Sequence, residues 1–203
     1  AGATILLDLH RDRYSARAEP HRSELAVTAA ASLANAVYLM GQQIGIVTNG
    51  RDAADRIREE GHRQDFATRN TARETFGMTE NSDRLRPVTV PTRRGADQLM
   101  RILETLARVE LTDGLTFPEL VTEAGARLPR DATVVALLPD VPLEAAIALG
   151  NLRRRGFAVT AVLMMYEEED HYPDCMARLM AERVDVRRIE DEAALSNLCA
   201  EQV

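Results

Sequence analysis

The sequence of 203 residues contains no lysine and no tryptophan, and only 4% of its residues are aromatic. Every basic residue apart from histidine is therefore an arginine. A chain without lysine has no P-loop lysine, no Schiff-base chemistry and no lysine general base. These classes of enzyme site are excluded.

Cysteine is also scarce, since only Cys175 and Cys199 are present. Two thiols far apart in the sequence cannot build a disulfide framework or a zinc knuckle, so we expect a reducing compartment. The expected location is the cytoplasm, or the cytoplasmic face of a membrane if a further portion of the protein is anchored there. The chain begins at Ala1 without Met and enters a strand pattern almost at once, so we expect a piece of a longer protein.

Long hydrophobic runs and several enzyme motifs are missing as well. The apolar run at 134–139 is far too short to cross a bilayer, and no signal peptide is visible, so this segment is expected to make no direct membrane contact. The sequence contains neither Gly-x-Ser-x-Gly nor a Gly-x-Gly-x-x-Gly after its first strand pattern, which argues against a nucleophile elbow and a standard dinucleotide site. A net charge of -7 argues against nucleic acid as a partner.

Short apolar runs alternate with amphipathic helical stretches along most of the chain. The predicted strands are 4–9, 43–48, 85–90, 132–138, 158–165 and 184–189. This alternation predicts a three-layer α/β/α fold with a doubly wound, mostly parallel sheet of about six strands. Pro87 assigns its strand to an edge, which can run antiparallel. We expect one domain over 1–203, with a polar insertion at about 51–83 and a turn at Asn49-Gly50.

Carboxylates follow two of the predicted strands. Asp8 closes the first strand, and Asp140 lies just past the strand at 132–138. In an open α/β sheet, ligands bind beyond the carboxyl ends of strands where the strand order reverses, so both side chains are expected to face one crevice. Thr116, at the start of a predicted helix, can add a hydroxyl there. Two carboxylates and a hydroxyl suit Mg²⁺ or Mn²⁺.

This order of strand, Asp8, helix, strand, threonine loop and second aspartate resembles the von Willebrand factor A domains. Their metal-ion-dependent adhesion site uses Asp-x-Ser-x-Ser after the first strand, a threonine in a later loop and an aspartate after the fourth strand. The resemblance implies a protein-binding site, whose residues here are Asp8, His10, Asp12, Thr116 and Asp140. The metal ligands among them would be Asp8, Asp12 and Asp140.

A more specific resemblance runs through the segments 24–34, 45–50 and 98–109. They are similar, in order and spacing, to the carboxy-terminal half of the bacterial family called domain of unknown function 58. The resemblance covers nearly the whole chain except the insertion. Genes of that family commonly neighbour those of MoxR-type AAA+ ATPases. It therefore implies a non-enzymatic module whose protein partner is an ATPase of this type, acting in assembly or maturation of a complex.

The adhesion motif itself is altered, because this chain has Asp8-Leu-His10-Arg-Asp12 where the motif has two serines. His10 and Asp12 can ligate a metal, since imidazole and carboxylate suit Mn²⁺ or Zn²⁺. Arg11 can instead neutralise one of the aspartates, or Asp8 can cap a helix or pair with an arginine. The expected cofactor is accordingly none, or a divalent cation, at a degenerate site.

Three functions remain open from the sequence. The first is the interaction module. The second is a metal-dependent hydrolase or phosphotransferase built on Asp8, Asp12 and Asp140. The third is a structural domain that supports another part of the protein. The acidic run 167–171 is a candidate docking surface for an arginine-rich partner, and Arg93 and Arg94, before a predicted helix, are candidates for holding an anion.

Overall fold

The computed structural model describes residues 2–54, 85–164, 171–191, 193 and 194. The central sheet has six strands in the order β4-β2-β1-β6-β7-β8. These strands are β1 (Gly2–Leu7), β2 (Gln43–Thr48), β4 (Val88–Arg93), β6 (Ala132–Leu138), β7 (Val159–Met164) and β8 (Asp185–Ile189). All neighbouring pairs are parallel except β2 with β4, which is antiparallel. The prediction of a mostly parallel, six-stranded sheet with one antiparallel edge strand is confirmed.

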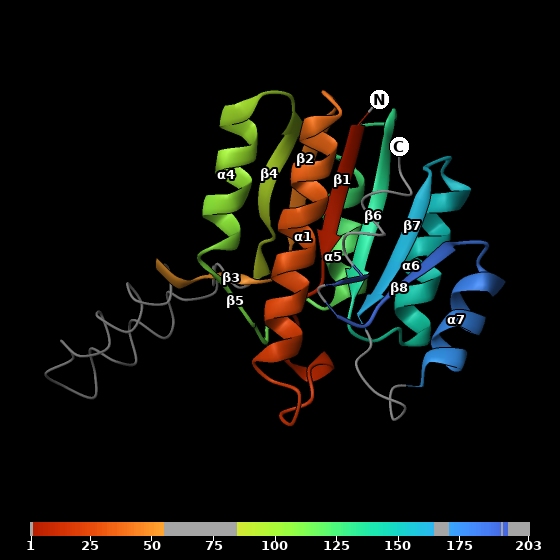
Figure 1. Cartoon of the computed structure of the whole chain (residues 1–203). Helices are drawn as coiled ribbons and strands as arrows, with labels where there is room; N and C mark the ends of the chain where they lie inside the picture. Colours follow the sequence, from red (N-terminus) through yellow and green to blue (C-terminus); the bar gives the residue numbers. More distant parts are fainter. Residues whose placement is uncertain (1, 55–84, 165–170, 192, 195–203) are drawn as a thin grey trace, which may run out of the picture.

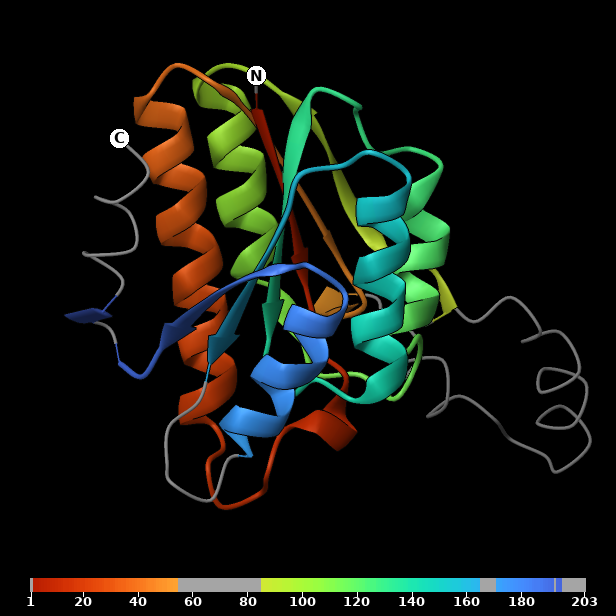
Figure 2. The same cartoon turned by 90° about the vertical axis from the view of Figure 1, so that its right-hand side faces the viewer.

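Helices cover both faces of this sheet (Figures 1 and 2). On one face lie α1 (His21–Leu39) and α4 (Ala96–Leu106), and on the other lie α5 (Phe117–Gly125), α6 (Leu143–Arg154) and α7 (Tyr172–Ala181). Side chains of a strand point alternately to the two faces, so Ile5 and Leu7 join the core under α1 while Leu6 joins the core under α5 and α6. The architecture is the predicted three-layer sandwich.

The buried face of α1 is made largely of alanine. Ala26, Ala29, Ala30 and Ala34 are all fully buried, and their small side chains let the helix lie close to the strands below it. The central strands β1 and β6 are apolar on both faces, as expected of parallel strands covered by helices on each side. Burial of the two faces thus explains why these runs lack alternation in the sequence.

Strand order reverses between β1 and β6, which are hydrogen-bonded neighbours at the centre of the sheet. Leu7 pairs with Leu137, so the residues that follow these two strands emerge side by side at the carboxyl end of the sheet. The chain leaves β1 toward α1 on one face and β6 toward α6 on the other. This arrangement places the loops that carry Asp8 and Asp140 next to each other, as expected at a reversal of strand order.

Some boundaries and one small sheet differ from the sequence prediction. The strands β2 and β6 have the predicted limits, whereas the edge strand lies at Val88–Arg93, three residues later than expected. Arg51–Asp52 (β3), predicted as the start of the insertion, instead pairs with Val109–Glu110 (β5) in a two-stranded sheet. Two-residue strands are too short to produce a sequence pattern. The rest of the insertion, residues 165–170 and Cys199 lie outside the described residues.

The helices were also searched for membrane-spanning segments. None of the described helices combines the length and the apolar character that crossing a membrane requires.

Candidate functional site

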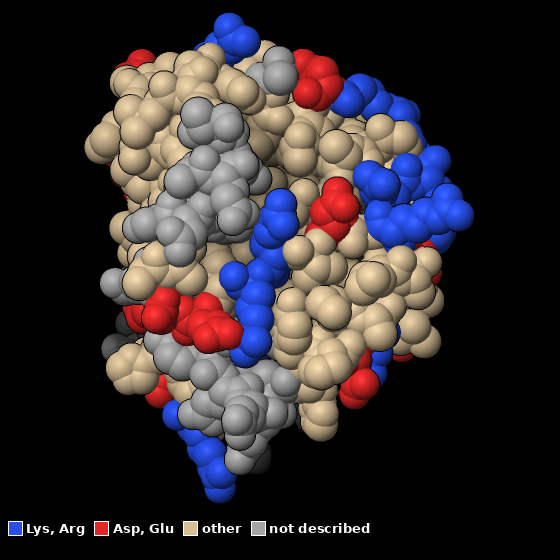
Figure 3. All heavy atoms as spheres, turned by 45° about the vertical axis from the view of Figure 1, so that its right-hand side comes forward, with Lys and Arg blue, Asp and Glu red and all other residues tan. Residues whose placement is uncertain are grey.

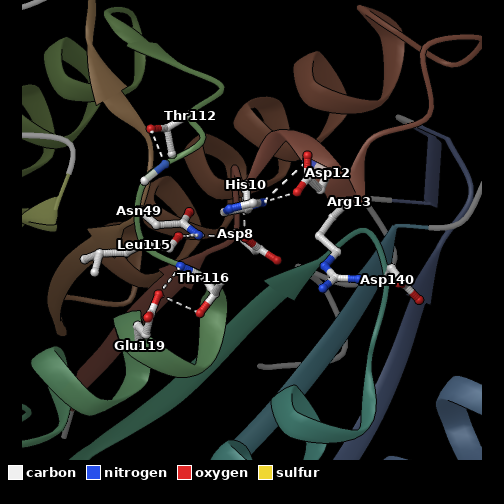
Figure 4. Close-up of polar contacts among 11 residues, drawn as sticks. Asp8, His10, Asp12, Arg13, Asn49, Thr112, Leu115, Thr116, Glu119 and Asp140 are labelled. Atoms are coloured by element: carbon white, nitrogen blue, oxygen red, sulfur yellow. Dashed lines mark hydrogen bonds and ion pairs between the residues drawn. The ribbon is translucent and has the colours of Figure 1, made fainter.

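Asp8 lies directly after β1 with only 2% of its surface exposed. Its Oδ1 atom accepts a hydrogen bond from the backbone N–H of His10 at 3.0 Å and another from the side-chain amide of Asn49 at 2.8 Å. Burial raises the pKa of the Asp8 carboxyl, although the hydrogen bonds from Asn49 and His10 act in the opposite direction. Asp8 is therefore a desolvated carboxylate whose first oxygen already has two donors (Figure 4).

Asn49 connects three segments that meet at the carboxyl end of the sheet. Its side-chain oxygen accepts the backbone N–H of Leu9 at 2.7 Å, and its amide nitrogen donates to Asp8 and, at 2.9 Å, to the carbonyl oxygen of Leu115. Only 1% of its surface is exposed. The sequence analysis treated Asn49 as a turn residue. The only signal that could have singled it out is its place directly after a buried strand.

The loop that follows Asp8 is held by backbone contacts on its inner side. Tyr14, whose ring is buried, donates its hydroxyl to the backbone carbonyl of Asp8 at 2.5 Å. Burial raises the pKa of this phenol well above its usual value, and the negative charge of Asp8 adds to the effect. Thr112 donates its N–H to the carbonyl of Leu9 at 3.1 Å and accepts the N–H of Arg11 at 2.7 Å. The threonine that lies against this loop is thus Thr112, which the sequence analysis did not single out.

His10 and Asp12 form a local pair within this loop. The imidazole of His10 is largely buried, and its Nδ1 atom accepts the backbone N–H of Asp12 at 3.4 Å. The Asp12 carboxylate lies 4.0 Å from the same nitrogen and has 78% of its side chain exposed. The short 3-10 helix η1 (Arg11–Arg13) begins here and turns the Asp12 side chain outward.

Asp140 is paired with an arginine of the Asp8 loop. Its Oδ2 atom lies 3.6 Å from Nη1 of Arg13, and the two side chains are 43% and 36% exposed. Its Oδ1 atom accepts the backbone N–H of Val141 at 2.8 Å and the thiol of Cys175 at 3.5 Å. Burial raises the pKa of that thiol, which favours the protonated donor. The arginine that reaches a carboxylate is Arg13, whereas Arg11, suggested by the sequence, is exposed.

Thr116 directs its polar groups to the helix that it precedes. Its backbone N–H and its hydroxyl both donate to the Glu119 carboxylate, each at 2.8 Å. These two bonds lower the pKa of Glu119. The interaction fixes the first turn of α5, as capping contacts generally do. In Figure 4 the Thr116 side chain lies with Glu119, while Asp140 lies with Arg13 on the other side of Asp8.

Comparison with solved structures identifies the fold. A structure described as von Willebrand factor type A from Catenulispora acidiphila matches all of this chain with a TM-score of 0.55 at 16% sequence identity, over 42% of that chain. The protein has a von Willebrand factor A-like fold. No protein-family model matches the sequence, and neither does any curated protein.

Two further structures share this von Willebrand factor A-like fold across 99% of the chain. The pilus adhesin SpaC from Lactobacillus rhamnosus GG, in its open conformation, has a TM-score of 0.60 at 11% identity, over 29% of that chain. Proximal thread matrix protein 1 from the mussel byssus has a TM-score of 0.57 at 11% identity, over 46% of that chain. The present chain spans less than half the length of each of the three matched chains. At these identities the likeness concerns the fold alone.

The three carboxylates expected to hold a cation are directed to different partners. Asp8 accepts bonds from Asn49 and His10, Asp12 extends into solvent, and Asp140 is paired with Arg13. Across the described part of the chain, no three side chains of the His, Cys, Asp or Glu type lie close enough together to hold a metal ion. As placed, these residues do not fit the ligand set of a von Willebrand factor A adhesion site.

Proposed function

We propose that this chain is a non-enzymatic protein–protein interaction module that binds its partner at the carboxyl end of the central sheet. The binding surface, called the rim below, consists of the loop at 8–14, the segment 112–119 and Asp140. The fold supports the proposal because von Willebrand factor A-like domains often serve as interaction modules, and a pilus adhesin and a byssal thread matrix protein share it.

The observation that carries the proposal is the arrangement around Asp8. A catalytic or adhesive metal would need several carboxylates gathered around one point, yet Asp12 extends into solvent and Asp140 faces Arg13. We infer that the adhesion site is degenerate and that recognition proceeds without a metal. The same arrangement disfavours a metal-dependent hydrolase, because such an enzyme needs its carboxylates gathered on the ion.

An apolar ridge adjoins the rim and gives it the composition of an interface. Leu143 and Ile147 lie one helical turn apart on α6, which starts just after Asp140, and they are 57% and 40% exposed. Protein interfaces combine an apolar centre with a polar border, and here the charged border consists of Asp12, Arg13 and Asp140. We propose that this ridge is the centre of the contact.

The partner proposed first is a MoxR-type AAA+ ATPase. This choice rests on the resemblance of the segments 24–34, 45–50 and 98–109 to the family called domain of unknown function 58. Binding of a purified MoxR-type ATPase should be measured by calorimetry, once with Mg²⁺ and once with EDTA in the absence of nucleotide. We expect binding in both conditions. An interaction that requires the metal would contradict the metal-independent mechanism.

Two substitutions locate the contact, and one serves as a matched control. Leu143→Ser and Arg13→Glu should each weaken binding at least about ten-fold, because they remove an apolar anchor and invert a border charge. Met100→Ser changes an equally exposed apolar residue on α4, 54% exposed, and should leave the affinity unchanged. Equal losses in all three variants would rule out the rim as the specific surface.

Two further measurements test the metal and the chemistry. If no ion binds, the melting temperature of the wild-type chain should stay constant on addition of millimolar Mg²⁺ or Mn²⁺. A bound ion at 100 times its dissociation constant would stabilise the fold by about 2.7 kcal/mol and would raise the melting temperature. Hydrolysis of p-nitrophenyl phosphate should not exceed the background rate with either ion. A rise in melting temperature that Asp8→Ala abolishes, or a turnover that it abolishes, would favour the metal-dependent enzyme instead.

A further inference from the structure

An open pocket of about 670 Å³ lies at the end of the molecule opposite the rim. It is formed where α6 and α7 end and lead into β7 and β8, so it borders the amino ends of those strands. The twelve residues of α6 span about 18 Å, and they separate the pocket from Asp140 at the other end of the helix. Three of its lining residues, Arg153, Arg154 and Arg183, are arginines, and Figure 3 shows arginine side chains gathered at the upper right of the molecule. The pocket is therefore a separate, basic site.

The turn that carries Arg183 has a backbone conformation that favours glycine. The helix α7 ends with hydrogen bonds from the N–H of Arg183 to Met180 and from Val184 to Leu179, while Arg183 has φ of +58°. The helix α6 ends with the same pair of bonds, and there Gly156 occupies the equivalent position with φ of +92°. Among the described residues, Arg183 is the only non-glycine residue with positive φ. Glycine adopts this conformation at lower cost, so an arginine at this position destabilises the turn relative to glycine.

Glu182, the acidic residue among those that line the pocket, forms a salt bridge with Arg154. Arg154 donates to the Glu182 carboxylate through Nη1 and to the side chain of Asn151 at 2.8 Å. A side chain at position 150 would collide with that carboxylate, so Gly150 leaves the space it occupies. Neither Arg153 nor Arg183 forms a salt bridge with any residue that the structure describes. Two of the arginines that line the pocket, one at each helix end, therefore have no acidic partner in the described part of the chain.

Several contacts hold the turn between α6 and β7, next to which Arg153 lies. The ring of Phe157, which is 3% exposed, is contacted by the guanidiniums of Arg130 and Arg155 at 5.3 and 5.8 Å from its centre. Arg130 also donates to the carbonyl of Arg155 at 2.8 Å, and Arg155 donates to Gly125 at 2.9 Å. These contacts fix the turn that carries Arg153.

We propose that this pocket binds an organic phosphate, with Arg153 at the end of α6 and Arg183 at the end of α7 holding the phosphoryl group. A phosphate has three oxygens that can accept hydrogen bonds from two guanidinium groups at once. The two oxygens of a carboxylate are both occupied by one bidentate guanidinium. The volume of about 670 Å³ exceeds what a bare phosphate needs and leaves room for an organic remainder. The phosphate belongs either to a free metabolite or to a phosphorylated side chain of a partner.

The test measures binding of phenyl phosphate to the whole chain by calorimetry, with phenylacetate as a carboxylate of similar shape. We expect phenyl phosphate to bind at least ten-fold more tightly than phenylacetate. Arg153→Ala and Arg183→Gly should each weaken the binding of phenyl phosphate at least ten-fold. Arg183→Gly should also raise the melting temperature of the unliganded protein, because glycine relieves the backbone cost. If the Arg183 side chain stabilises the fold, the melting temperature of Arg183→Gly will instead be lower than that of the wild type.

Arg101→Ala is the matched control, since it removes an exposed arginine of α4, on the face of the sheet opposite α6. Its affinity for phenyl phosphate should equal that of the wild type. The proposal is overturned if the wild type does not bind phenyl phosphate, if both pocket variants bind normally, or if Arg101→Ala loses binding. A phosphoserine peptide that binds more tightly than phenyl phosphate assigns the ligand to a partner protein, and one that binds less tightly assigns it to a metabolite.

Discussion

The side-chain amide of Asn49 donates a hydrogen bond of 2.8 Å to the carboxylate of Asp8, although the two residues are 41 positions apart. The contact joins the end of β2 to the end of β1, and the same amide nitrogen reaches Leu115 ahead of α5. One buried side chain thus fixes the relative positions of three loops of the rim. The stability of the fold and the shape of the proposed binding surface depend on the same residue.

Replacement of Asn49 by alanine should destabilise the protein strongly. It leaves the N–H of Leu9, the carbonyl of Leu115 and one oxygen of Asp8 without their partner in a buried setting. We expect a loss of about 2–4 kcal/mol in the free energy of unfolding, measured in urea. Asn35→Ala, at an exposed position of α1, should change it by no more than about 0.5 kcal/mol. A loss below about 1 kcal/mol for Asn49→Ala would show that the three loops do not depend on this amide.

Asp8→Asn should stabilise the protein at neutral pH. Burial raises the pKa of Asp8 above its ordinary value of 3.8, so the folded state holds the proton more tightly than the unfolded state does. This contribution to stability is complete below the unfolded pKa and is lost as the pH rises through the folded pKa. At pH 7 the charged group therefore opposes folding, whereas an asparagine can still accept from Asn49 and His10 at the same oxygen position.

The measurement is the melting temperature of Asp8→Asn and of the wild type between pH 7 and pH 4. We expect the variant to melt higher at pH 7, by about 2–4 °C for each kcal/mol gained, and the difference to shrink as the pH falls. Asp131→Asn removes the same charge at an exposed position and should show no such trend. If Asp8→Asn melts lower than the wild type at pH 7, the ionised carboxylate stabilises the fold and this account of its pKa is wrong.

Much of the fold can be predicted from the sequence because the strands that build it are long apolar runs. The strands β2 and β6 have their predicted limits, since each is buried on both faces and bounded by turn residues. Once the alternation of strands and helices implies a doubly wound sheet, Asp8 and Asp140 follow as neighbours at its carboxyl end. Here a pattern that is local in the sequence determines a position in three dimensions.

The partners of these carboxylates could not be predicted in the same way. Asn49 precedes a glycine, and Asn-Gly is so common in turns that its buried bonds leave no sequence signal. The choice of Arg13 over Arg11 as the partner of Asp140 depends on the 3-10 turn of η1, which no periodic pattern encodes. Both cases depend on contacts between segments distant in sequence. Such contacts follow from loop geometry, which hydrophobic periodicity does not specify.

Thr116→Ala should cost about 1 kcal/mol at neutral pH, because it removes a contact that fixes the first turn of α5. Hydrogen bonds from Thr116 lower the pKa of Glu119 below its ordinary value of 4.5, so the stabilisation is present above that pH and is lost as the pH falls through the folded pKa. Urea unfolding at pH 7 and near pH 3 should therefore show a cost that shrinks in acid.

A neighbouring threonine provides the control for this variant. Thr122 donates its hydroxyl to the carbonyl of Pro118 within the same helix and contacts no carboxylate in the described part of the chain. Thr122→Ala should change the free energy of unfolding by no more than about 0.5 kcal/mol, equally at both pH values. A cost of Thr116→Ala that does not depend on pH would mean that the Glu119 carboxylate contributes nothing to the start of α5.

The pair between Arg13 and Asp140 should contribute little to stability, whatever its importance for binding. The two atoms are 3.6 Å apart and both side chains are more than a third exposed, which places the pair among the weakly stabilising surface contacts. A double-mutant cycle of Arg13→Ala and Asp140→Ala, measured by urea unfolding, should give a coupling energy below about 1 kcal/mol that decreases further in about 0.5 M NaCl. Asp140→Ala alone should cost more than Arg13→Ala, because it also removes the acceptor for Val141 and Cys175. A coupling above about 2 kcal/mol that resists salt would instead identify Arg13 as a structural replacement for a metal ion, buried by the loops around it.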